Sequence, residues 1–260
     1  MNVSLKGKRA LVCGSTQGIG LAIAQELALL GAHCTLLARN AERLEETVQR
    51  LDRSMDQQHQ WFAVDFSDNA AVTNLLSAIS TSPYHILVNN TGGPPAGKIS
   101  EAKEQDFLSA LNLHLINNHN ITMALLPGMK SLGYGRIINI ISTSVKIPLP
   151  NLGVSNTTRA AVASWAKTMA NEVAIDGITV NNVLPGATST QRLSSIIGNK
   201  SAKTGLSTEA VEEEMIHEIP MRRFGLPEEI AALAAFLATP AAAYITGQSI
   251  CVDGGRTGSI

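Results

Sequence analysis

Short apolar segments rich in β-branched residues alternate with longer segments of helical periodicity along the 260 residues of this chain. The clearest helical segment has apolar side chains on one face, at Ala41, Leu44, Val48 and Leu51, and charged side chains between them. Continuous apolar strands are typical of a parallel sheet that is covered on both faces. The alternation therefore predicts a single α/β domain over residues 1–260, with a doubly wound sheet of about seven parallel strands and helices on both faces.

The predicted elements follow one another in regular order. The expected strands are Arg9–Cys13, Cys34–Leu37, Trp61–Val64, Ile86–Val88, Ile137–Ile141, Thr179–Leu184 and Ser249–Val252. The expected helices are Ile19–Leu30, Ala41–Leu51, Ala70–Ser80, Gln105–Met129, Thr158–Ala174 and Pro227–Ala238. Residues 187–219 depart furthest from this order, and a connection of that length predicts a lid over a binding site. Its apolar side chains suit a hydrophobic substrate or, as we favour, packing of the lid on its own domain.

Composition excludes several classes of function. The net charge is −1 and only 16% of residues are charged, so nothing in the charge pattern favours nucleic acid or an anionic membrane. The amino-terminal segment lacks the apolar core of a signal peptide, and no apolar run approaches the length of a membrane span. Cys13, Cys34 and Cys251 lie in apolar runs without metal-ligand spacing. We expect free thiols, a cytoplasmic protein and no metal site.

A glycine-rich turn joins the first strand to the first helix. It consists of Gly14, Ser15, Thr16, Gln17, Gly18, Ile19 and Gly20. Glycines allow the backbone to approach a pyrophosphate closely, and the start of the helix offers free N–H groups and the positive end of its dipole. The turn therefore predicts a dinucleotide site, although a turn of this kind can also serve only to close the βα unit.

Three further strand ends support a dinucleotide site. No carboxylate follows the second strand, where one would bind a ribose 2′-hydroxyl, and Arg39 stands there instead. Arginine suits a 2′-phosphate, which favours NADP(H) over NAD(H), unless Arg39 is merely solvated. Asp65 and Phe66 follow the third strand and suit an adenine edge. Asn89, Asn90, Thr91 and Gly92 follow the fourth, at the sheet edge that carries ligands in open α/β sheets.

Taken together, these motifs resemble the short-chain dehydrogenase/reductase superfamily, over essentially the whole chain. The resemblance also covers Asn112 on the long central helix, Ser142 after the fifth strand, Pro185 and Gly186 after the sixth, and the segments PMRRFGLPEEIA and YITGQSICVDGG. It implies a Rossmann-type fold and a nicotinamide cofactor contacted by Thr188 and Thr190. It also implies a catalytic role for Asn112 and Ser142. The carboxyl-terminal segments are similar to those of 3-oxoacyl-acyl-carrier-protein reductases, and a homotetramer or homodimer is expected.

The resemblance breaks at the two residues that move the proton in this superfamily. Ser155 and Arg159 stand where the family has tyrosine and lysine. Arg159 keeps the positive charge and can bind ribose hydroxyls, but arginine does not join a proton relay. An aliphatic hydroxyl is a far weaker acid than a phenol, which titrates near pH ~10. We therefore hypothesise that Ser142 and Ser155 hold a water molecule that donates the proton. Alternatively, Ser155 is only a small helix residue in a relic site.

Two functions follow from this reading. The first is an NADP(H)-dependent oxidoreductase that reduces a small carbonyl compound, such as a 3-oxoacyl thioester, with a non-standard proton donor. The second is a catalytically quiet dinucleotide-binding protein that acts as a sensor or as a partner subunit. Lys146, near Ser142, could bind an anionic substrate, but a solvated loop lysine is favoured. His114 and His119 on the central helix are expected to have surface or interface roles.

Overall fold

The computed structural model describes residues 1–258. Within them, seven parallel strands form one sheet in the order β3-β2-β1-β4-β5-β6-β7. The strands are β1 (Arg9–Cys13), β2 (His33–Ala38), β3 (Gln60–Ala63), β4 (Ile86–Asn89), β5 (Gly135–Ile140), β6 (Ile178–Pro185) and β7 (Ser249–Val252). The predicted doubly wound parallel sheet is confirmed. The order reverses between β1 and β4, and such a switch point opens a crevice at the carboxyl edge of the sheet.

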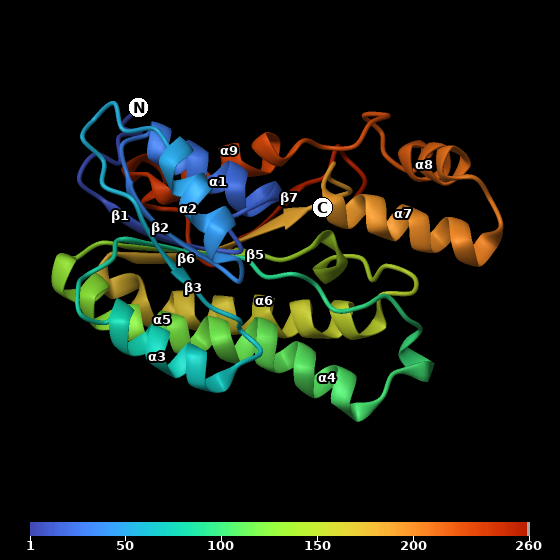
Figure 1. The fold of residues 1–260 in the computed structure, drawn as a ribbon, viewed down its shortest axis with the longest axis horizontal. Coiled ribbons are helices and arrows are strands. Elements are labelled where there is room, and N and C mark those ends of the chain that lie inside the picture. The colour runs from blue at the N-terminus through green and yellow to red at the C-terminus, as the bar shows by residue number, and fades with distance from the viewer. Residues whose placement is uncertain (259–260) are drawn as a thin grey trace.

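Helices cover both faces of the sheet (Figure 1). One face carries α1 (Gly18–Leu29), α2 (Ala41–Arg50) and α9 (Pro227–Ala238). The other carries α3 (Asn69–Ile79), α5 (Asn117–Leu132) and α6 (Gly153–Val173), with α4 (Glu104–Leu111) before α5. Short 3₁₀ helices occupy Ile99–Glu101, Thr143–Val145, Ala174–Asp176 and Pro240–Ala242. No helix in residues 1–258 is long and apolar enough to cross a membrane.

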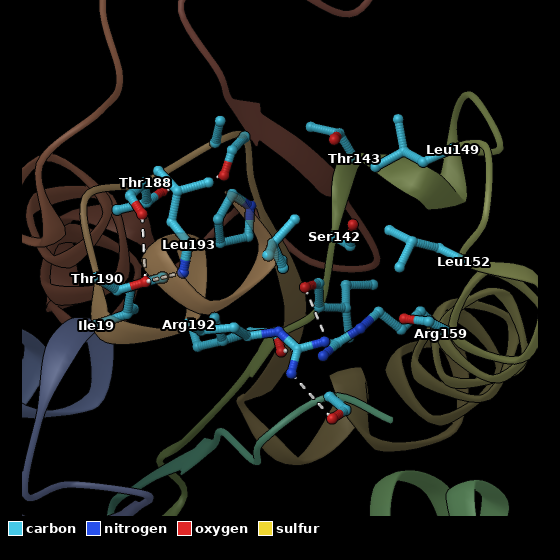
Figure 2. A pocket seen from close by; sticks show the side chains of 18 of the residues that line it. Ile19, Ser142, Thr143, Leu149, Leu152, Arg159, Thr188, Thr190, Arg192 and Leu193 are labelled. Carbon is cyan, nitrogen blue, oxygen red and sulfur yellow. Dashed lines mark hydrogen bonds between the residues drawn. The ribbon is translucent and has the colours of Figure 1, made fainter. Parts of the chain in front are cut away.

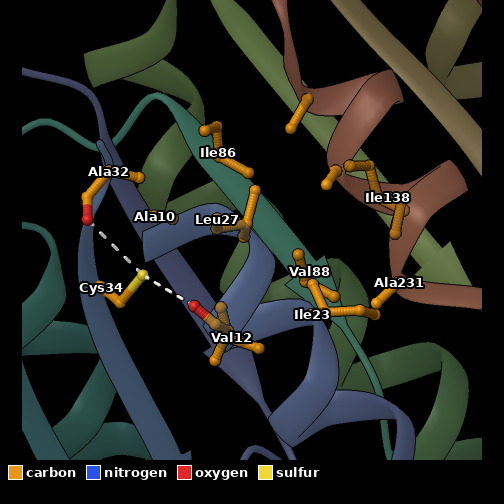
Figure 3. Packing of buried hydrophobic residues seen from close by; sticks show 14 of the residues in the cluster. Ala10, Val12, Ile23, Leu27, Ala32, Cys34, Ile86, Val88, Ile138 and Ala231 are labelled. Carbon is orange, nitrogen blue, oxygen red and sulfur yellow. Dashed lines mark hydrogen bonds between the residues drawn. The ribbon is translucent and has the colours of Figure 1, made fainter. Parts of the chain in front are cut away.

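Each face of the sheet has its own apolar layer. Figure 3 shows the layer under α1 and α9, where Val12, Ile23 and Leu27 pack together in full burial. A second layer lies under α3, α5 and α6 and includes Leu11, Ile121 and Val180. Cys13 and Cys34 are buried free thiols, as predicted, and Cys251 is half-buried and free. The two layers fix the strands, and with them the loops at the carboxyl edge.

The long central helix is not continuous. A π-helical turn, Asn112–Ile116, lies between α4 and α5. A π turn holds more residues than an α turn, so it changes which side chains face the sheet. The turn therefore determines which central-helix residue reaches the site.

Residues 187–219 contain two helices, α7 (Gln191–Thr204) and α8 (Thr208–His217), which extend beyond the sheet at one end of the molecule (Figure 1). Leu193 and Ile197 of α7 pack with Val211 of α8 in a small apolar cluster. This cluster is separate from the two layers that cover the sheet. These side chains thus pack between the two helices of the segment, rather than on the layers of the sheet as the favoured interpretation expected.

Candidate active site

The larger of two adjoining clefts lies beyond the carboxyl ends of β1, β2, β3 and β4 and measures about 590 Å³. Most of the predicted cofactor residues that line it are Gly14, Thr16, Gly18, Ile19, Arg39, Asp65, Phe66, Asn90 and Gly92, and Thr190 joins them from beyond β6. All but Thr190 come from four separate strand ends, which the parallel sheet brings to one edge. Hydrogen bonds from the backbone and hydroxyl of Ser67 hold the pKa of Asp65 below its usual value.

The glycine-rich turn packs tightly against its neighbours. Gly14 has φ +59°, in the left-handed region, and a Cβ placed there would lie 2.7 Å from the backbone oxygen of Asn90. A Cβ on Gly20 would lie only 2.1 Å from the backbone oxygen of Gly14. The Asn90 side chain donates to the backbone oxygens of Cys13 and Gly14. Backbone and side chain thus fix the turn at the start of α1, where N–H groups are free for an anion.

Three of the predicted cofactor residues do not line either cleft. Ser15 is fully buried, and its hydroxyl donates to the backbone oxygen of Leu37. Asn89 is buried and donates to Asn139 across the sheet. Gly20 serves the close packing of the turn. The structure therefore gives Ser15, Asn89 and Gly20 supporting positions behind the cleft wall.

The smaller cleft, about 240 Å³, lies beyond β5 and β6 (Figure 2). It brings together nine of the site residues predicted from the sequence, namely Ile19, Asn90, Ser142, Ser155, Arg159, Pro185, Gly186, Thr188 and Thr190. Residues from α7 and α8 complete its wall, including Leu193, Ile196 and Met215. The apolar side chains of residues 187–219 thus serve both the local cluster and the cleft. Lys146 is exposed and does not line the cleft.

Ser142, Ser155 and Arg159 reach this cleft from two elements. The Ser142 side chain accepts a hydrogen bond from the backbone N–H of Ser144 at 3.1 Å. Ser155 and Arg159 lie one turn apart on α6 and are buried. Arg159 Nη1 donates to the backbone oxygens of Ile140, at 3.3 Å, and Ile141, at 2.9 Å. Burial, and then the charge of Arg192, lower the pKa of Arg159 to about 10, which leaves it positively charged at neutral pH.

The structure does not bring Asn112 to either cleft. Asn112 is exposed on the outer side of the π-helical turn, whereas His114 points inward and is only 3% exposed. His114 Nδ1 lies 2.7 Å from the hydroxyl oxygen of Thr91, a residue that lines both clefts. The expected surface role of His114 is therefore wrong. His119 instead accepts a hydrogen bond from the Trp165 indole.

Acid is expected to destabilise the protein through His114. Burial, and then the charges of Arg159 and Arg192, lower the His114 pKa from 6.5 to about 3. Below pH 6.5 the His114 imidazole therefore binds a proton in the unfolded chain but stays neutral in the folded chain. The free energy of unfolding falls as pH falls from 6.5 toward 3. Between pH 7 and 5 this residue should contribute a loss of about 2 kcal/mol.

Urea unfolding of His114→Asn at pH 7 and pH 5 measures this contribution. His114→Asn should lose less stability on acidification than the unmodified protein. The control is His217→Asn, at an exposed histidine of α8, which should lose as much stability as the unmodified protein. An equal loss in all three proteins would contradict the assignment.

Arginines are prominent among the cleft residues that escaped the sequence reasoning. Arg43, in the first turn of α2, lines the larger cleft with Arg39. Thr91 was seen only as part of a motif. Arg192 lines both clefts and donates to the backbone oxygens of Gly93, at 3.0 Å, and Pro94, at 3.1 Å. The position of Arg43 next to a strand end was a usable signal, whereas the contacts of Arg192 join segments far apart in the sequence.

No group of three or more His, Cys, Asp or Glu side chains suited to a metal ion occurs within the described residues.

The family model described as enoyl-(acyl carrier protein) reductase matches residues 14–257. A 3-oxoacyl-[acyl-carrier-protein] reductase of Rickettsia conorii is 34% identical, over 97% of this chain and 98% of that protein. A chloroplastic tropinone reductase homolog of Arabidopsis thaliana is 32% identical, over 98% of this chain and 77% of that protein.

A solved structure agrees with these matches. The L-sorbose reductase of Gluconobacter frateurii, complexed with NADPH and L-sorbose, superposes with a TM-score of 0.93 at 32% identity, over all of both chains. The fold, the glycine-rich turn and the two clefts at the carboxyl edge fit the same family. The chain belongs to the short-chain dehydrogenase/reductase superfamily and is an NAD(P)-dependent oxidoreductase that acts on carbonyl or hydroxyl groups.

Proposed function

We propose that this protein is an NADP(H)-dependent reductase of a small carbonyl compound, with a proton donor other than tyrosine. The observation that carries the proposal is the convergence of Ser142, Ser155 and Arg159 in a cleft that adjoins the glycine-rich turn. The relatives support this chemistry, because one is a 3-oxoacyl-[acyl-carrier-protein] reductase and another was solved with NADPH and L-sorbose. We also propose that residues 187–219 act as the lid of the substrate cleft, within a single domain.

The chain's own residues fit a dinucleotide. Gly14 and Gly20 leave no room for side chains, so the backbone of the turn stays close to the start of α1 and its N–H groups remain accessible. A Cβ on Gly92, by contrast, would meet no protein atom within 4 Å, which leaves open space beside the cleft. The cleft of about 590 Å³ is large enough for a ligand of substantial size. These features support the turn and its surroundings as the diphosphate site.

The proton would reach the substrate oxygen from a water molecule held by two serines. When bound in the adjoining cleft, NADPH would supply the hydride for the carbonyl carbon. Ser142 is fixed by Ser144, and Ser155 lies on the wall of the same cleft, so both hydroxyls can hold a water molecule or the substrate oxygen. We propose that this water gives its proton to the oxygen, and that the hydroxide left behind takes a proton from solvent water at the open mouth of the cleft. Arg159 stabilises negative charge on the oxygen, because it stays protonated.

Preference for NADP(H) rests on two arginines. Arg39 and Arg43 line the larger cleft together, and both are exposed and thus free to receive a 2′-phosphate. The double variant Arg39→Ala/Arg43→Ala is expected to raise the Kd for NADPH by about 10- to 100-fold, because two charge-assisted contacts are lost. The Kd for NADH should change little. Fluorescence titration with both nucleotides measures this, and equal weakening of both would contradict the phosphate assignment.

One observation favours the alternative of a quiet cofactor-binding protein. Among the described residues, no tyrosine lines either cleft. Tyr84 is buried against Thr35, the Tyr134 hydroxyl donates to the backbone oxygen of Ala238, and Tyr244 is exposed. Titration with NADPH and NADH, followed by assays with an acetoacetyl thioester and a panel of diketones, separates the two functions. Activity that appears only in Ser155→Tyr/Arg159→Lys would favour the quiet protein, and turnover by the unmodified protein would favour the reductase.

We further propose that copies of the chain associate, as a homotetramer or a homodimer, through the long helices and the carboxyl-terminal edge. Four large apolar side chains along α4, the π-helical turn and α5 are exposed, namely Leu108, Ile116, Met123 and Leu132. Their exposure supports a partner surface there, since burial of such side chains is favourable.

A further inference from the structure

Two guanidinium groups meet in the smaller cleft from opposite sides. Figure 2 shows Arg159, from α6, and Arg192, from the first turn of α7, directed toward each other. Both approach one point, because a Cβ on Gly93 would lie 2.6 Å from Arg192 Nη2 and 3.2 Å from Arg159 Nη2. Arg159 is buried, and Arg192 lies at the solvent-accessible mouth of the cleft.

Neither guanidinium is neutralised by the part of the protein that the structure describes. Ion pairs within residues 1–258 use other cations, and no Asp or Glu from that range lines the smaller cleft. A third arginine in its wall, Arg256, is paired with Glu218. Among the described residues, the hydrogen-bond acceptors of Arg159 and Arg192 are all backbone oxygens, those of Ile140, Ile141, Gly93 and Pro94. Like charges held this close repel, and a buried charge is costly unless it is paired.

We propose that the missing negative charge is a carboxylate of the substrate, held between Arg159 and Arg192. The substrate is then a small oxo acid, or the hydroxy acid in the reverse direction. This inference rests on the proposed function, which it narrows. Guanidinium groups match the planar carboxylate geometrically, and a cleft of about 240 Å³ suits a ligand smaller than most drugs.

The position of Arg159 also sets the place of the reacting carbonyl. Its Nη1 binds the backbone oxygen of Ile141, the residue directly before Ser142. A carboxylate on Arg159 therefore lies near Ser142 and Ser155, so the carbonyl that these serines contact is separated from the carboxylate by few bonds. This geometry points to 2-oxo or 3-oxo acids.

The other source of an oxyanion is the diphosphate of the dinucleotide, because Arg192 also lines the larger cleft. The start of α1 offers that diphosphate its own N–H groups, however. The two sources make different predictions. If Arg192 binds a substrate carboxylate, its substitution should leave the affinity for the nucleotide nearly unchanged. If Arg192 binds the diphosphate, the same substitution should weaken nucleotide binding.

Calorimetry on the full chain saturated with NADP⁺ tests the proposal. Pyruvate and acetoacetate are titrated beside pyruvamide and acetoacetamide, which lack the charge. We expect binding of the acids and weak binding of the amides. Arg192→Gln should raise the Kd of the acids by about 10- to 100-fold, and Arg192→Lys should restore part of the affinity. The Kd of NADP⁺ should stay within about threefold, and Arg50→Gln, on the exposed end of α2, should change neither.

The outcomes separate this inference from the proposed function. Equal binding of acids and amides, or an unchanged acid Kd in Arg192→Gln, overturns the carboxylate site. A parallel rise in the Kd of NADP⁺ and of the acids overturns it in favour of the diphosphate. If the unmodified protein binds no NADPH, the proposed function itself is overturned, and the carboxylate site of an NADP(H)-dependent reductase falls with it.

Discussion

Replacement of Ser155 by alanine is expected to lower kcat by about 10²- to 10⁴-fold, the usual contribution of a positioned proton donor. Under the proposed mechanism, Ser155 and Ser142 hold the water that protonates the substrate oxygen. Alanine keeps α6 intact and removes only the hydroxyl at the cleft wall. The measurement is steady-state turnover in H₂O and D₂O, with a large solvent isotope effect on the unmodified protein.

Thr157→Ala provides the matched control on the same helix. Its hydroxyl is exposed and donates to the backbone oxygen of Gly153, away from the cleft. This variant should retain turnover, and both variants should keep the Kd for NADPH. An unchanged kcat in Ser155→Ala would contradict the two-serine mechanism. Ser155 would then be only a small helix residue with no role in proton transfer.

Gly20→Ala is expected to remove nucleotide binding and to weaken the fold. The added Cβ would lie 2.1 Å from the backbone oxygen of Gly14 and 2.6 Å from the Asn90 side chain, so the turn must move. Overpacking against backbone should lower the free energy of unfolding by about 3 kcal/mol. Loss of two or more charge-assisted N–H contacts should raise the Kd for NADPH by at least about 100-fold. Denaturant unfolding and nucleotide titration measure the two effects.

Gly198→Ala is the control, because a Cβ at that position of α7 meets no atom within 4 Å. Alanine in a helix interior should raise stability by up to about 1 kcal/mol and leave NADPH affinity unchanged. Tight nucleotide binding by Gly20→Ala would show that the turn can relax without cost to the diphosphate site.

The periodicity of apolar residues predicted the sheet well, because buried parallel strands are continuous apolar runs. β1 and β7 have the bounds expected from the sequence. The expected helix starts also lie within one residue of the observed ones, except for that of α6. α6 begins at Gly153 rather than at Thr158, since its first turn is made of small and polar residues that carry no apolar stripe. The two helices of residues 187–219 also escaped, because long-range packing rather than strong periodicity fixes them.

The site was predictable only where local sequence dictates position. Glycines and strand ends located the larger cleft. His114 rather than Asn112 faces the inner side of the central helix, and this depends on a π-helical turn. The sequence of the turn, NLHLI, contains no glycine or proline that would predict it. Arg192 reaches Gly93 and Pro94 across almost a hundred residues of chain. Such contacts exist only once the fold has formed.

The small apolar cluster of α7 and α8 has a consequence for how such a protein diversifies. Leu193, Ile197 and Val211 pack with one another rather than with the layers on the sheet. Mutations of these residues therefore alter packing mainly within α7 and α8. Under the proposed lid role, relatives could vary the parts of these helices that lie beyond Arg192, and with them the substrate cleft, without disturbing the apolar layers on the sheet. Transplanting residues 193–217 between relatives is the corresponding route for an enzyme engineer.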